Sequence, residues 1–88
     1  MAVIKKKIWP EYFKDVKSGK KKFELRLADF KVKKGDKLIL EEWDPKVEKY
    51  TGREIKARVG YVLKTKNLWF WSKKDIEKYG LQIIQIEV

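Results

Sequence analysis

The chain of 88 residues contains neither cysteine nor histidine. Without cysteine there is no disulfide, no zinc–thiolate site and no thiol nucleophile. Without histidine the chain lacks the commonest general base and the commonest metal ligand. A Ser-His-Asp or Cys-His catalytic site is therefore excluded, and any metal would have to be bound by oxygen atoms alone. We expect neither a metal ion nor a cofactor.

Long apolar runs are also missing. The longest dense one, Leu68–Trp71, has four residues, whereas a membrane-spanning helix needs about 20. The first seven residues carry three lysines and are not followed by the apolar core of a signal peptide. Together with the absence of cysteine, this predicts a cytoplasmic protein that makes no membrane contact. The length predicts one domain over residues 1–88, which we expect to be a monomer.

Positive charge is abundant, and it is unevenly distributed. The formal net charge is +10; residues 1–40 hold thirteen basic and five acidic residues, so they contribute +8 of it. Such an excess is typical of a surface that binds a polyanion. The alternative is a thermophile-like composition, because lysine is far commoner than arginine, asparagine or glutamine. Heat adaptation would raise lysine and glutamate together, so the local excess favours an anionic partner.

The hydrophobic and aromatic content, 43% and 14%, predicts a folded chain. Pro10 suits the first turn of a helix, Gly19 suits its end, and Ser72 suits the cap of a second helix. Gly60 indicates a bulge within a strand. The patterns predict strands over 3–8, 22–27, 37–43, 53–63 and 81–88, and helices over 9–19 and 72–79. These elements predict a mostly β (α+β) fold, a small mixed or antiparallel β-barrel of five to six strands with two short helices.

The segment Gly19–Arg26 is the most informative for function. Its alternation places Lys22, Glu24 and Arg26 on one face of the expected strand. Glu24 and Arg26 can form an ion-paired floor, with Lys20 and Lys21 at its mouth to meet a phosphate or a base edge. The alternative is a solvated strand face with routine ion pairs.

Two further features can contact nucleic acid. Trp69 and Trp71 alternate along the chain and have lysines on both sides, so they can stack on unpaired bases; alternatively, at least one of them fills the core. Arg53 follows the turn 50–52 and can contact a phosphate or a base. Its alternative role is to pair with a nearby carboxylate.

Four residues share a spacing with a known family. Gly19, Lys21, Glu24 and Arg26 form the pattern G-x-K-x-x-E-x-R after a short helix, which resembles the ASCH domain of the PUA-like superfamily. The resemblance covers nearly the whole chain, which looks like a member of an uncharacterised ASCH-like family of small, single-domain prokaryotic proteins. It continues through Trp9–Phe13, Gly35–Asp36, Leu40–Pro45 and Tyr50–Arg53.

This resemblance implies a PUA-like β-barrel with a cleft between the barrel and the first helix, and a role in RNA binding. Some ASCH-type proteins are instead enzymes. One class removes an acyl group from modified cytidine nucleosides with a lysine, a threonine and a later glutamate, and another cleaves RNA. Here Lys21 matches the lysine, Glu24 stands where that class has threonine, and no residue clearly matches the later glutamate, for which Glu77 is a candidate.

Two functions therefore stay open. The first is an RNA-binding or nucleotide-binding domain with a basic cleft. The alternative is a small amidohydrolase or a ribonuclease-type enzyme that acts through Lys21 and Glu24. The residues expected to contact nucleic acid are Gly19, Lys20, Lys21, Lys22, Glu24, Arg26, Arg53, Trp69 and Trp71, with further phosphate contacts from Lys5, Lys6 and Lys7.

Overall fold

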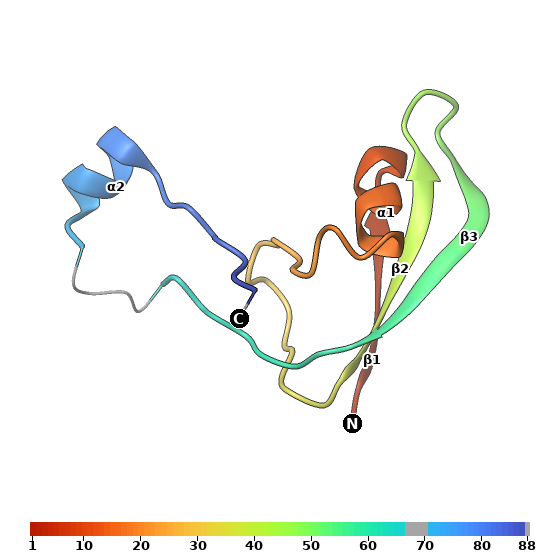
Figure 1. Ribbon diagram of the computed structural model, residues 1–88, viewed down its shortest axis with the longest axis horizontal. Helices are drawn as coiled ribbons and strands as arrows, with labels where there is room; N and C mark the ends of the chain where they lie inside the picture. Colours follow the sequence, from red (N-terminus) through yellow and green to blue (C-terminus); the bar gives the residue numbers. More distant parts are fainter. Residues whose placement is uncertain (67–70, 88) are drawn as a thin grey trace.

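The computed structural model describes residues 1–66 and 71–87, which form a small α+β structure (Figure 1). Its elements are strand β1 (Val3–Ile8), helix α1 (Pro10–Lys17), strands β2 (Lys37–Asp44) and β3 (Lys49–Arg58), and helix α2 (Lys73–Tyr79). The three strands form one mixed sheet in the order β1-β2-β3. β2 lies between a parallel neighbour, β1, and an antiparallel neighbour, β3.

Helix α1 lies within the predicted range 9–19 but is shorter, beginning at Pro10 and ending at Lys17. Pro10 is its first residue, a position where a backbone N–H would have no hydrogen-bond partner within the helix, so proline is tolerated there. Glu11 lies in the first turn, near the positive end of the helix dipole. Gly19 follows the helix with a φ of +82°, a conformation in which other residues are strained. The chain therefore turns directly after α1 and enters the segment 20–26.

The core lies between α1 and one face of the sheet. Ile8, Phe13 and Leu40 are buried there. Val16, Leu38 and Ile55 pack around them. Because side chains alternate across a strand, this set fixes which face of each strand is turned toward α1. Among the described residues no helix or strand packs on the other face, and α2 lies far from the sheet in Figure 1.

The buried carboxylate of Asp36 joins the start of β1 to the turn that precedes β2. It accepts hydrogen bonds from the backbone N–H of Ala2 at 2.9 Å and of Lys33 at 3.0 Å. The bond from Ala2 is the main cause that lowers the pKa of Asp36, and the bond from Lys33 is the next. The turn itself needs Gly35, whose φ is +95°. This arrangement places β1 beside β2 in parallel register.

Two expected strands are absent from the structure. The segments 22–27 and 81–87 have irregular backbone, and the hydrogen bond from the Lys22 N–H to Gln85 Oε1 at 2.8 Å joins them through a side chain instead of a strand ladder. β3 begins at Lys49 and ends at Arg58, earlier at both ends than expected, because the turn at 45–48 is tight and brings Lys49 opposite Asp44. Gly60 therefore lies outside the strand, and the irregularity in the ladder falls between Glu41 and Trp43.

Helix α2 is bounded by the residues that the sequence predicts. α2 is preceded by Ser72, whose hydroxyl accepts from the Asp75 N–H at 3.0 Å, and it ends at Gly80, as the sequence predicts. Over residues 1–66 and 71–87, neither helix is long or apolar enough to cross a membrane.

Candidate nucleic-acid interface

Lys21, Glu24 and Arg26 come together as one group, which we call the Glu24 cluster. Lys21 Nζ lies 3.3 Å from Glu24 Oε1, and Arg26 Nε donates to Glu24 Oε2 at 2.6 Å. All three side chains are partly buried, with 17–30% of their surface exposed. The expected ion pair between Glu24 and Arg26 is therefore confirmed. It forms on irregular backbone rather than on a strand face.

The Glu24 cluster is attached to both α1 and β1. The Lys21 N–H donates to the carbonyl of Asp15 in α1 at 3.0 Å, and Arg26 Nη2 donates to the carbonyl of Lys7 in β1. The ammonium of Lys21 also lies 5.1 Å from the ring centre of Tyr12 and 5.3 Å from that of Phe23. These contacts hold the cluster beside α1 without a ladder of backbone hydrogen bonds.

The Glu24 cluster combines cations with exposed rings. Two cations share one carboxylate, so the group keeps a formal charge of +1. Arg26 Nη1 takes part in neither of the contacts that Arg26 makes with Glu24 and Lys7. The Tyr12 and Phe23 rings beside Lys21 are 48% and 38% exposed. Such a surface can offer donors to a phosphate and ring faces to an unpaired base.

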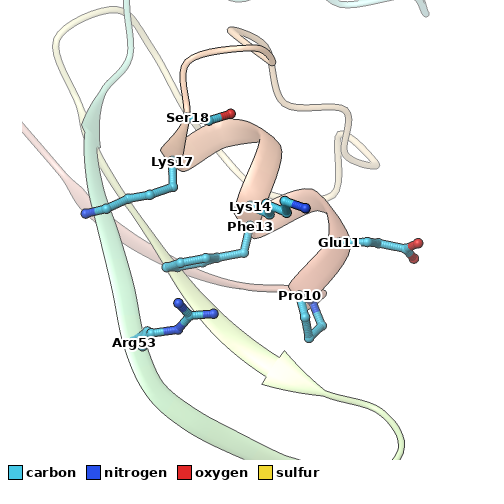
Figure 2. A pocket seen from close by; sticks show the side chains of 7 residues that line it. All are labelled: Pro10, Glu11, Phe13, Lys14, Lys17, Ser18 and Arg53. Atoms are coloured by element: carbon cyan, nitrogen blue, oxygen red, sulfur yellow. The ribbon is translucent and has the colours of Figure 1, made fainter.

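Arg53 lies in a hollow on the β3 side of α1, which we call the α1 hollow (Figure 2). Figure 2 shows the guanidinium of Arg53 beside the ring of Phe13, with the side chain of Lys17 beyond that ring. The guanidinium carbon of Arg53 is 4.8 Å from the centre of the Phe13 ring. The residues that line the hollow are Pro10, Glu11, Phe13, Lys14, Lys17, Ser18 and Arg53.

Arg53 pairs with a buried carboxylate that the sequence analysis did not single out. Its Nε donates to Glu42 Oε1 at 2.9 Å and its Nη2 to Glu42 Oε2 at 2.8 Å. Thr51 Oγ1 donates to the same carboxylate at 2.5 Å. Glu42 is only 1% exposed, whereas the side chain of Arg53 is 67% exposed. The alternative of an arginine paired with a carboxylate is therefore confirmed, and contact between Arg53 and a ligand stays a prediction.

The pairing sets the charge states of both partners. Hydrogen bonds from Arg53 lower the pKa of Glu42, although burial acts to raise it. The same hydrogen bonds with Glu42 raise the pKa of Arg53. A signal for Glu42 was present in the sequence: Glu42 alternates with Leu38 and Leu40 along β2, so it shares their inward face. An acid in such a position needs a buried partner.

The remaining predicted contacts are dispersed. Lys20 and Lys22 are exposed beside the Glu24 cluster, but the lysine run on β1 is divided between the two faces of the sheet. Lys6 Nζ lies 3.8 Å from the ring centre of Phe30, whereas Lys7 Nζ lies over Trp43. Trp71 is 48% exposed and precedes α2, a helix that lies far from α1 (Figure 1). Trp69 lies outside the described residues.

Two hollows in the described part of the chain lie outside the Glu24 cluster. Besides the α1 hollow, a second hollow is lined by Met1, Gly35–Lys37 and Lys56–Arg58. Neither of these two hollows is lined by Lys21 or Glu24. Within residues 1–66 and 71–87 no group of three or more acidic residues could hold a metal ion. The Glu24 cluster is thus a partly exposed group outside these two hollows.

Comparison with known proteins identifies a family. The chain is 43% identical over 53 residues to an "Uncharacterized 12.9 kDa protein in GpA 3'region" of Escherichia phage P2, a match that covers 60% of this chain and 47% of that protein. The chain thus spans about half the length of this curated relative. No solved structure matches. The family model described as "Domain of unknown function (DUF3850)" matches residues 4–73, most of the chain, so the protein belongs to the DUF3850 family.

Proposed function

We propose that this protein is an RNA-binding or nucleotide-binding domain that makes contact through the Glu24 cluster. One observation supports this most directly: Glu24 holds the cations of Lys21 and Arg26 together beside the exposed rings of Tyr12 and Phe23. Cations interleaved with exposed rings are the usual components of a surface that binds single-stranded nucleic acid. The charge of +8 in residues 1–40 supplies a favourable field around them.

The salt dependence of RNA affinity tests this proposal. We expect the affinity for a short single-stranded RNA to fall as salt rises, because bound phosphates release counterions. Replacing Lys21 and Arg26 together by glutamine should weaken binding about tenfold and lower the salt slope by about two. Fluorescence anisotropy of labelled RNA over a series of salt concentrations measures both quantities.

A matched variant controls for net charge. Lys73→Gln with Lys74→Gln removes the same charge from α2, far from the Glu24 cluster, and should change affinity by less than about threefold. Equal losses in the two double variants would contradict a localised site. Turnover of acylated nucleosides or of RNA that Lys21→Ala abolishes would instead establish the hydrolytic alternative, for which Lys21 and Glu24 are the candidate catalytic residues.

We also propose that the chain closes into a PUA-like barrel, as the resemblance to the ASCH domain implies. Segments 22–27 and 81–87 would supply the additional strands. Two observations support this. The Lys22 N–H already donates to Gln85, and Leu25, Leu27, Ile84 and Ile86 expose 68–81% of their surface. Slow amide exchange along both segments is expected if they pair, whereas exchange at the rate of an unfolded chain would contradict the barrel.

A further inference from the structure

The face of the sheet that is turned away from α1 forms a second surface, which we call the open face. Ile8 and Leu40 point toward α1, so their neighbours along β1 and β2 point the other way. Residues that pair across the strands share a face, so the pairing register arranges the open face in rows. The rows through Lys37, Ile39 and Glu41 extend from β1 through β2 to β3, whereas the row through Trp43 joins β2 and β3 alone.

Two rows at one end of the open face are basic. In the first, Lys37 lies opposite Arg58. In the second, Ile39 is flanked by Lys5 on β1 and Lys56 on β3. The four cationic side chains are exposed, whereas Ile39 is 8% exposed. Because no acidic residue belongs to either row, this end presents a broad positive surface.

The other end of the open face is aromatic. Trp43 and Tyr50 lie opposite each other, and Tyr50 is 52% exposed. The ammonium of Lys7 lies 4.5 Å from the ring centre of Trp43 and 5.6 Å from that of Tyr50. Contact with two rings confirms that Lys7 points to the open face. Its flexible stem allows the ammonium to leave the rings and meet a phosphate when a base stacks there.

One row between these ends is acidic. Glu41 and Glu54 lie directly opposite each other, with Lys7 beside Glu41 on β1. Like charges in this position repel, so the row does not stabilise the sheet by itself. Carboxylates accept hydrogen bonds from the amino groups of bases. The three kinds of row thus correspond to the three parts of a nucleotide strand: phosphates, base edges and base faces.

We propose that the open face binds single-stranded nucleic acid, with phosphates on the basic rows and bases stacked on Trp43 and Tyr50. From Ile39 to Trp43 is about 13 Å along β2, which is long enough for a strand to reach both ends. The basic side chains outnumber the acidic ones on this face, so its charge complements a polyanion. This surface is separate from the Glu24 cluster, which lies on the α1 side of the sheet.

Two variants test the two ends of the open face. We expect Lys5→Glu with Lys56→Glu to weaken binding of a labelled oligocytidine about tenfold or more and to lower the salt slope by about two. Tyr50→Ala should weaken binding about fivefold with an unchanged slope, because stacking does not involve counterions. Lys73→Glu with Lys74→Glu has the same charge change on α2 and should have the smallest effect. Circular dichroism confirms that each variant is folded.

The outcomes separate this proposal from that for the Glu24 cluster. Wild-type affinity in both open-face variants would overturn the open-face proposal, whether or not the glutamine variants of Lys21 and Arg26 bind. Loss in the open-face variants alone would support the open face and contradict the cluster. Equal affinity for a duplex or for polyglutamate would also overturn the proposal, because neither presents an unpaired base to the rings.

Discussion

Phe13→Ala is expected to destabilise the protein by about 3–5 kcal/mol, because it removes a ring buried between the helix and the sheet. Phe13 is 3% exposed and packs with Ile8 and Leu40, which are also buried. Net stabilities of small domains are about 5–15 kcal/mol, so this loss is a large part of the total. Urea unfolding followed by circular dichroism measures it.

Tyr12→Ala is the matched control for this substitution. Tyr12 neighbours Phe13 in α1, but its side chain is 48% exposed and lies beside Lys21 rather than in the core. We expect its removal to cost less than about 1 kcal/mol. If both variants unfold at the same urea concentration, the core does not lie where the structure places it. Tyr12→Ala also tests the Glu24 cluster. Because this variant is expected to stay folded, a loss of its RNA affinity would report on the cluster and not on the stability of the fold.

The sequence predicts well the elements whose signals are local. Pro10 and Gly19 bound α1, and Ser72 with Gly80 bounds α2, because helix ends depend on residues within one turn. The apolar run Leu38–Leu40 directly after the Gly35–Asp36 turn is likewise a local signal, and it gives β2. The segment 22–27 has a clear polar–apolar alternation but is not a strand, because a strand also needs a partner that local pattern does not specify.

The contacts of the candidate site also divide into those that local spacing predicts and those that depend on distant parts of the chain. Glu24 and Arg26 are two residues apart, so their ion pair follows from local spacing alone. Glu42 and Arg53 are eleven residues apart, and their contact depends on the tight turn at 45–48 and the irregular register that follows it. Alternation indicates that Glu42 is inward-facing, but it does not identify which cation reaches it. Long-range pairing is therefore the part of the site that only the structure supplies.

Arg53→Met is expected to destabilise the protein at neutral pH, because it removes the two hydrogen bonds that Arg53 donates to the buried carboxylate of Glu42 and leaves the one from Thr51. An ionised buried group that loses its partner costs about 1–3 kcal/mol. The lower end of this range applies, since the Arg53 side chain is 67% exposed and water can replace part of its contact. Adding Glu42→Leu should restore most of the loss, because an apolar residue of similar size needs no partner.

The pH dependence distinguishes this ion pair from simple packing of Arg53 against Phe13. Hydrogen bonds from Arg53 lower the pKa of Glu42 in the folded protein. The stability that the pair contributes is therefore fully present above the unfolded pKa of glutamate, about 4.3, and is lost as the pH falls through the folded pKa. Urea unfolding should show a large difference between wild type and Arg53→Met at about pH 7 and a much smaller one near pH 3. A difference that stays constant over this range would mean that Arg53 stabilises the fold through its contact with the ring of Phe13 rather than through Glu42.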